Sequence, residues 1–140
     1  MIFQAKFNLE DALAALPKST VMMGVPTFYT RLLSDARFNQ DLVKHMRLFV
    51  SGSAPLLAET HVQFEERTGH RILERYGMSE TNMNTSNPYD GDRRAGTVGL
   101  PLPGVEVKIC DAYGNALPQG DTGEIEVRGP NVFQGYWQIP

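Results

Sequence analysis

The sequence predicts an α/β fold, with a parallel sheet and covering helices in residues 1–80, followed by a β-rich part. Up to residue 80, short apolar runs alternate with stretches of helical period, whereas later apolar and charged residues alternate with a period of two. Only four of the 13 glycines and three of the nine prolines precede residue 81, so turn residues concentrate in the later part. We therefore divide the chain into an α/β portion, residues 1–80, and a β-rich portion of the same domain, residues 81–140.

The α/β portion contains signals for three strands with helices between them. A first helix is expected over residues 7–16, where Asn8 is the N-cap and two acidic residues follow near the positive end of the helix dipole. Buried strands are predicted at residues 21–24 and 47–50, and a third begins at 72–74. This order of elements is typical of a parallel sheet.

Proline, glycine and the change of period set the other boundaries. Pro26 and Pro55 each predict the start of a helix, because the first helical turn tolerates proline. Gly69 is expected to end the second of these helices. Residues 105–109 and 124–128 alternate apolar and charged side chains and are predicted to be half-buried antiparallel strands.

Composition excludes several classes of function. A net charge of -3 and a pI near 5.6 argue against nucleic-acid and anionic-membrane partners, which require clustered basic residues. The single cysteine, Cys110, permits no intramolecular disulfide, and the three histidines have no metal-ligand spacing, so no zinc site is predicted. No apolar run is long enough to cross a bilayer. We expect a cytoplasmic location, and a mitochondrial location of a longer protein to which this chain belongs is the alternative.

Residues 74–81, Glu-Arg-Tyr-Gly-Met-Ser-Glu-Thr, are the strongest candidate for a functional site. They offer a ring for a nucleotide base, a hydroxyl for a phosphate and a carboxylate for a magnesium ion, and we expect them to form one tight turn. A purely structural alternative is a turn whose serine and glutamate cap a helix.

Three blocks of sequence, in this order, resemble the adenylate-forming superfamily of acyl-CoA synthetases, luciferases and peptide-synthetase adenylation domains. They are residues 51–56, the octapeptide 74–81, and residues 123–130 followed by Gly-Tyr-Trp at 135–137. The strings MGVPTFYTRLL, MRLFVSGSAPLL and ERYGMSETNMNTSNPYDGDR are similar, more narrowly, to the malonyl-CoA synthetases. The resemblance implies an acid-thiol ligase that uses ATP and Mg²⁺ to adenylate malonate or methylmalonate and then transfers the acyl group to CoA. It also implies that the β-rich portion belongs to a distorted β-barrel.

The family's phosphate loop, its ribose-binding aspartate and its catalytic lysine are not recognisable in this sequence. We therefore interpret the chain as an internal fragment of a synthetase, with the remainder of the parent enzyme as its partner. Because residues that act as a unit fail together when several are removed, we expect the fragment alone to be inactive.

The resemblance implies roles for residues of the octapeptide. Glu80 matches the magnesium ligand, and Ser79 matches a position that is usually threonine and contacts the α-phosphate, so both are the catalytic candidates. Tyr76 matches the ring that packs on adenine, while Gly77 lets the backbone come close. For the second hydroxyl, Thr81, a nucleotide contact and a capping role are equally open.

A second group of residues is expected to complete the nucleotide site and bind the acyl group. The resemblance implies that small residues form the other wall against adenine, although residue type alone favours a structural helix start. The distal carboxylate of malonate requires a strong, preferably bidentate donor, and Arg31 is the candidate. The full set is Gly52, Ser53, Ala54, Pro55 and Arg75 for the nucleotide, and Arg31, Ser51, Ser53 and Met78 for the acyl group, with Arg75 and Arg47 as alternates to Arg31.

Two other functions remain open from the sequence. One is an acyl-CoA ligase for a monocarboxylate, for which an uncharged partner in place of Arg31 would be expected at the substrate. The other is a non-catalytic nucleotide-binding or interaction module.

Overall fold

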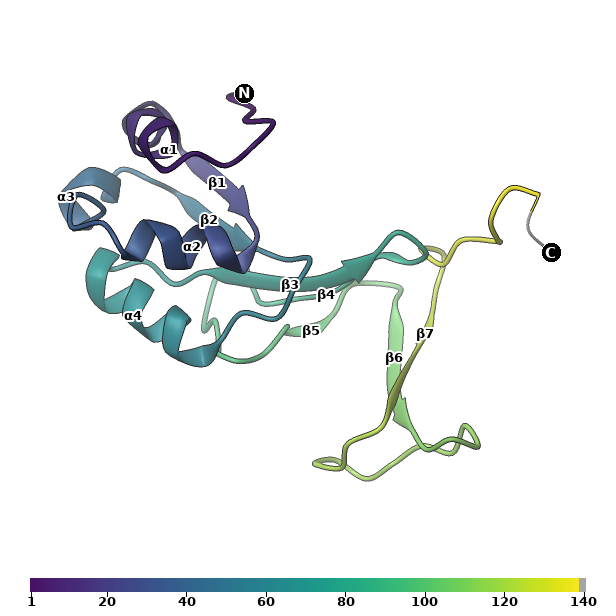
Figure 1. Cartoon of the computed structure of the whole chain (residues 1–140). Coiled ribbons are helices and arrows are strands. Elements are labelled where there is room, and N and C mark those ends of the chain that lie inside the picture. Colours follow the sequence, from purple (N-terminus) through teal and green to yellow (C-terminus); the bar gives the residue numbers. More distant parts are fainter. Residues whose placement is uncertain (139–140) are drawn as a thin grey trace.

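The computed structural model describes residues 1–138 and contains a five-stranded mixed sheet and a separate two-stranded ribbon (Figure 1). The strands of the sheet lie in the order β1-β2-β3-β4-β5, with β1, β2 and β3 parallel and β4 and β5 antiparallel to their neighbours. Their bounds are β1 Val21–Gly24, β2 Leu48–Ser51, β3 Leu73–Met78, β4 Asn82–Ser86 and β5 Leu100–Pro101. The predicted α/β class and the three parallel strands are confirmed.

Helix α1, Leu9–Ala15, and the 3-10 turn η1, Leu16–Lys18, precede β1. Helices α2, Pro26–Leu33, and α3, Gln40–Val43, lie between β1 and β2 in sequence, and α4, Ala58–Thr68, lies between β2 and β3. The N-cap prediction is confirmed, because the Asn8 side chain accepts a hydrogen bond from the backbone N–H of Asp11 at 3.1 Å. Gly69 ends α4 in the left-handed conformation, with φ of 74°, and donates its N–H to Glu65 at 2.7 Å. No helix within residues 1–138 is long and apolar enough to cross a membrane.

The predicted helix start at Pro55 is wrong. Helix α4 begins three residues later, at Ala58, and Leu57 is its N-cap residue without a side-chain hydrogen bond. The backbone N–H of Leu56 is donated to the buried carboxylate of Glu74 instead, at 2.9 Å. Since this contact holds the segment after β2 against β3, the helix starts only where the chain leaves the sheet.

One hydrophobic core stabilises the α/β portion. The ring of Phe64 on α4 lies at its centre, with centroid distances of 5.5 Å to Tyr29, 5.6 Å to Phe38 and 5.0 Å to Phe49. The hydroxyl of Tyr29 donates to the carbonyl of Val50 at 2.6 Å, so its polar end is satisfied inside the core. This packing joins α2, α4 and β2 into one rigid frame.

The sheet continues across residue 80. Strand β3, predicted only from residue 72 to 74, extends to Met78, and β4 follows it in an antiparallel hairpin. The period-two strands are confirmed as β6, Glu106–Cys110, and β7, Glu124–Arg128, which pair antiparallel. The half-burial expected of both strands is wrong for β7, where Ile125 is exposed and only Val127 is half-buried. Within residues 1–138 they form an open ribbon and not a closed barrel, and Figure 1 shows this ribbon projecting away from the helices. The division of the chain into two portions at residue 80 remains a proposal. The sheet itself crosses that boundary, because β3 pairs with β4.

Candidate nucleotide and metal site

The predicted site residues lie mostly at the carboxyl edge of the parallel strands. Strands β1 and β2 end there, at Gly24 and Ser51, and the chain then enters the loop 52–57. Ser51 is paired with Glu74, so β3 continues four residues past this edge to Met78 before the turn 79–81. In open α/β sheets this edge is where ligands bind, because loops from neighbouring strands meet there. The topology therefore brings the loop 52–57 beside Glu74 and Arg75 of β3, while the turn 79–81 lies farther along that strand.

The loop after β2 presents small, exposed residues. The N–H of Gly52 is donated to the carbonyl of Gly24 at 3.4 Å, and Ser53 follows with φ of 67°, a left-handed conformation. Ser53, Ala54 and Pro55 are exposed, and a Cβ on Gly52 would lie 3.5 Å from the carbonyl oxygen of Arg75. A flat group could approach this loop without meeting a large side chain.

Glu74 connects this loop to β3, a role that the sequence did not indicate. The side chain is 3% exposed, and one carboxylate oxygen accepts the N–H of Leu56 while the other has no partner. Burial raises the pKa of Glu74, although the hydrogen bond from Leu56 partly opposes this effect. Ser51, its register partner on β2, is also fully buried and its hydroxyl has no hydrogen-bond partner.

The expectation that residues 74–81 form one tight turn is wrong. Residues 74–78 are strand, and only residues 79–81 turn the chain into β4. The register of β3 and β4 shifts between Tyr76 and Gly77, and a Cβ on Gly77 would lie only 2.0 Å from the carbonyl oxygen of Asn82. A bulge that needs glycine therefore aims the end of β3.

The three residues of the turn have different surroundings. Ser79 is exposed and Glu80 half-buried, whereas Thr81 is 8% exposed and its hydroxyl accepts a hydrogen bond from the side-chain amide of Asn84 at 2.8 Å. The backbone N–H of Thr81 is donated to the carbonyl of Met78 at 3.2 Å. The turn thus presents Ser79 and Glu80 outward, while Thr81 anchors it.

The carboxylate of Glu80 accepts a hydrogen bond from the hydroxyl of Tyr136, near the end of the described chain. This bond, assisted by the backbone N–H of Glu80 itself, lowers the pKa of Glu80 below its ordinary value. No local sequence signal indicates this contact. Tyr136 belongs to the Gly-Tyr-Trp string, which in the sequence analysis contributed only to the family resemblance.

The donor set fits a magnesium ion that is shared with a nucleotide. No group of three or more histidine, cysteine, aspartate or glutamate residues gathers within residues 1–138, so this segment holds no all-protein metal cage. Glu80 is an accessible carboxylate with the Ser79 hydroxyl beside it. Magnesium is commonly held by one or two carboxylates together with phosphate oxygens and waters, an arrangement this turn could serve.

The three arginines considered for substrate or nucleotide binding have different surroundings. Arg31 is exposed on α2, and its guanidinium stacks 4.8 Å from the centre of the Phe7 ring. Arg75 donates to the sulfur of Met83 at 3.1 Å, and its buried Nε has no partner. Arg47 donates to the hydroxyl of Tyr89 at 3.2 Å. Their assignment to substrate or nucleotide remains a prediction.

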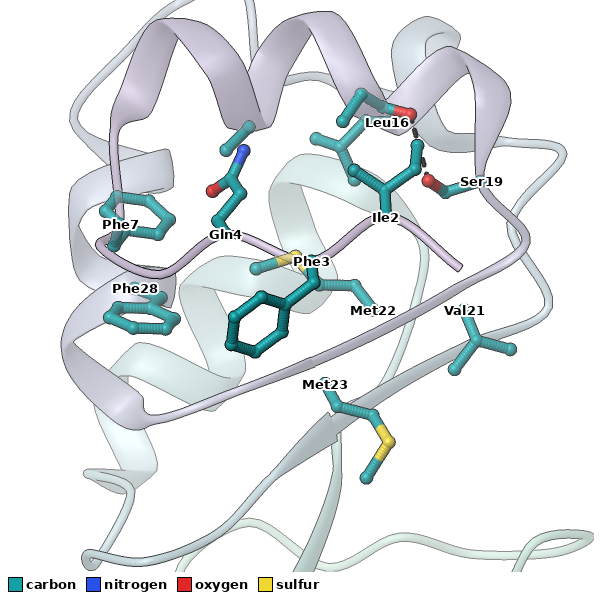
Figure 2. A pocket seen from close by; sticks show the side chains of 12 residues that line it. Ile2, Phe3, Gln4, Phe7, Leu16, Ser19, Val21, Met22, Met23 and Phe28 are labelled. Carbon is teal, nitrogen blue, oxygen red and sulfur yellow. Dashed lines mark hydrogen bonds between the residues drawn. The ribbon is translucent and has the colours of Figure 1, made fainter.

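The predicted base and acyl contacts are partly accessible. Tyr76 is half-buried, Met78 is exposed, and the Tyr76 hydroxyl lies 4.0 Å from the Met78 sulfur. A separate apolar groove of about 320 Å³ lies between the N-terminal segment and β1, which the sequence did not predict (Figure 2). Phe3, Phe7, Met22 and Phe28 line it, and Arg31 stacks on its Phe7 edge.

Parallel strands that end at a small-residue loop, beside a strand that carries an aromatic ring and a carboxylate past that edge, are typical of α/β enzyme domains that bind a nucleotide. The chain belongs to the AMP-binding enzyme family, whose model matches residues 2–137. This result confirms the resemblance to adenylate-forming enzymes.

Among curated relatives, the chain is 46% identical over 129 residues to the malonate-CoA ligase of Arabidopsis thaliana. It is 44% identical over 129 residues to a probable CoA ligase, CCL8, of Humulus lupulus. Each alignment covers 86% of this chain and 21% of the relative. The chain thus spans about a fifth of the length of these relatives.

The chain is also similar to a segment of several larger solved structures. ATP-bound MatB from Rhodopseudomonas palustris is 60% identical, with a TM-score of 0.96 over 100% of this chain and 28% of that chain. A malonyl-CoA ligase in a ternary product complex with methylmalonyl-CoA and AMP is 45% identical, with a TM-score of 0.82 over 96% of this chain and 30% of that chain. The backbone arrangement described above is therefore that of a segment within larger ligases.

Proposed function

We propose that this chain is a segment of the AMP-binding domain of a malonate-CoA ligase, which uses ATP to adenylate malonate and then transfers the malonyl group to CoA. The observation that carries the proposal is the 46% identity to the malonate-CoA ligase of Arabidopsis thaliana over 86% of this chain. The 60% identity to ATP-bound MatB supports the use of ATP, and the identity to the malonyl-CoA ligase complex with methylmalonyl-CoA supports the same substrate class. Methylmalonate is an alternative acyl substrate.

The proposal gives each segment of the site a task. The loop 52–55 and the ring of Tyr76 bracket the adenine, with Gly77 allowing the close approach. Ser79 donates its hydroxyl to the α-phosphate. Arg75, whose Nε would lie 4.0 Å from a Cβ on Gly52, adds a positive charge beside the loop.

The adenylation barrier is electrostatic, because a carboxylate anion must attack an anionic phosphate. Glu80 would hold a magnesium ion, which when bound neutralises part of the phosphate charge. The chain itself contributes the orientation of this carboxylate and the hydroxyl donor beside it. Both are placed by the hairpin between β3 and β4.

The acyl group would bind beside the same edge. Arg31 pairs with the distal carboxylate of malonate, Ser51 or Ser53 adds a hydroxyl, and Met78 fills the space that a short acyl chain leaves. Since Arg31 stacks on Phe7 in the described chain, its guanidinium must turn from that ring toward the substrate. A cytoplasmic location is part of the proposal; one relative is the mitochondrial malonate-CoA ligase of Mus musculus.

A segment exchange tests this function. The matching segment of the Rhodopseudomonas palustris MatB is replaced by this chain, and malonate-dependent pyrophosphate release and malonyl-CoA formation are measured. The control exchange uses the corresponding segment of the benzoate CoA ligase from Burkholderia xenovorans, a 30% identical structure with a TM-score of 0.84. We expect the first hybrid to use malonate and the control hybrid to lose that selectivity.

The outcomes separate the alternatives. A hybrid that prefers butyrate to malonate would make this segment that of a monocarboxylate ligase. A folded hybrid that binds ATP but forms no acyl-adenylate with any acid would favour the non-catalytic module.

A further inference from the structure

The last part of the described chain returns to the turn that carries Glu80. After β7, the chain meets the end of the β3–β4 hairpin, where residues 131–136 contact residues about fifty positions earlier in sequence (Figure 1). The roles proposed above do not use this segment. It makes three kinds of contact, each to a different part of the turn.

The first contact is an asparagine anchor. The side-chain amide of Asn131 donates to the carbonyl of Thr81 at 2.6 Å and to the side-chain oxygen of Asn84 at 3.0 Å. Asn84 is fully buried and donates in turn to the Thr81 hydroxyl at 2.8 Å. Because the Asn131 amide N–H groups bond to Thr81 and Asn84, the anchor fixes where the returning segment lies, although the side-chain oxygen of Asn131 has no partner.

The second contact holds the backbone of the proposed metal ligand. The N–H of Phe133 is donated to the carbonyl of Glu80 at 2.8 Å. The ring of Phe133 also packs edge-on against the ring of Tyr136, with centroids 4.9 Å apart and an interplanar angle of 80°. The backbone of Glu80 and the ring of Tyr136 are thus tied to the same residue.

The third contact reaches the carboxylate itself. The Tyr136 hydroxyl donates to Oε1 of Glu80. A glutamate on an exposed turn otherwise samples several rotamers, whose loss opposes metal binding. A hydrogen bond to one oxygen selects a rotamer and leaves the second oxygen available, as outer partners of metal-binding carboxylates do elsewhere.

We propose that Tyr136 is a positioning residue, which together with the Asn131 anchor orients the Glu80 carboxylate for the metal ion that accompanies ATP. This inference rests on the proposed function, in which Glu80 is the metal ligand. It gives the tyrosine of the Gly-Tyr-Trp string a role at the proposed metal site.

The test uses Tyr136→Phe in the segment-exchange ligase, which removes only the hydroxyl. Affinity for Mn²⁺ in the presence of ATP is measured by electron paramagnetic resonance, and the Mg²⁺ concentration for half-maximal adenylation by pyrophosphate release. We expect both to weaken about tenfold, the lower end of what losing an outer partner of a metal ligand costs. The KM for CoA and the unfolding temperature should stay unchanged.

Tyr113→Phe is the matched control, since this tyrosine lies in the turn between β6 and β7 and is 90% exposed. It should change neither metal measurement. Asn131→Ala, which removes the anchor and keeps the phenol, should weaken Mn²⁺ binding in the same direction.

Unchanged Mn²⁺ affinity in Tyr136→Phe would overturn the inference. The same loss in Tyr113→Phe would overturn it as well, because the effect would then not be local. Failure of the proposed function gives a different result, in which the unmodified hybrid does not use malonate whatever the Tyr136 variant does to Mn²⁺ binding.

Discussion

The α/β part and the ribbon are held together by different forces. The helices and β1–β3 share a core of aromatic and aliphatic side chains, whereas in the described chain beyond Asn87 only Cys110 is buried. The ribbon instead relies on its own backbone ladder and on exposed ion pairs such as Lys108–Glu126 at 2.9 Å. Exposed pairs of this kind stabilise by only about 0.2–1 kcal/mol each.

The proposed metal site therefore lies at the junction between the packed α/β part and the polar segment that follows β7. The turn 79–81 leaves a strand of the packed sheet and receives the hydrogen bonds of Asn131, Phe133 and Tyr136 from the ribbon side. A core resists small displacements because its side chains interdigitate, while a polar attachment can adjust. We infer that the α/β part fixes the position of the nucleotide and the returning segment sets the orientation of the metal ligand.

The first prediction asks whether the packed part alone sets acyl selectivity. In the complete ligase, Arg31→Leu should lower kcat/KM for malonate by about 10⁴, because a site built around a polar partner discriminates to that degree when the partner is lost. Butyrate should be used as well as before or better. The measurement is kcat/KM for both acids, with Arg67→Leu on the exposed side of α4 as the control.

Parallel losses for malonate and butyrate would make Arg31 structural. No loss for either would make it a surface residue stacked on Phe7, and Arg75 would be tested next.

The second prediction contrasts the two kinds of stabilisation. Phe64→Ala removes the central ring of the core and should lower the free energy of unfolding of the chain by about 3–5 kcal/mol. Val127→Ala in β7, at a half-buried position, should cost less than half as much. Urea unfolding followed by circular dichroism measures both, and equal costs would contradict the contrast drawn here.

The third prediction concerns the junction. Glu80→Gln in the complete ligase keeps the size of the side chain and removes its charge, so kcat for adenylation should fall by about 100-fold or more, as loss of one electrostatic stabiliser commonly does. Binding of the nucleoside part should change little. Pyrophosphate release across a magnesium titration is the measurement; near-normal rates would reduce Glu80 to a turn residue.

The smallest effect is a pH dependence from Glu74. Its pKa is raised in the folded chain above the ordinary 4.5, so the folded state binds this proton more tightly than the unfolded state. The contribution of Glu74 to stability is therefore greatest below pH 4.5 and declines as pH rises through the raised pKa. Glu74→Gln can still accept the Leu56 N–H and removes this decline.

Unfolding midpoints of both proteins from pH 4 to pH 8 test this prediction, since about one unit on each side of a pKa captures most of a titration. The stability of the unmodified chain relative to Glu74→Gln should fall with rising pH. A constant difference would mean that Glu74 titrates alike in the folded and unfolded states.

Local signals in the sequence were sufficient to predict most of the helices and strands. The Asn8 cap, the end of α4 at Gly69 and the strand 124–128 were predicted correctly, because capping, left-handed glycine and period-two alternation depend on neighbouring residues. The three blocks at residues 51–56, 74–81 and 123–137, taken together, also indicated the family, which the family model confirms.

Tertiary structure decided what depends on contacts between distant residues. Helix α4 starts at Ala58 because Glu74 takes the Leu56 N–H, and the octapeptide is mostly strand because β4 pairs with it. The contact of Tyr136 with Glu80 joins residues 56 positions apart, and the sequence has no periodicity that encodes such a pair. Residue type determined which groups could bind a nucleotide and a metal, while the closing of the chain onto the sheet edge decided which of them meet.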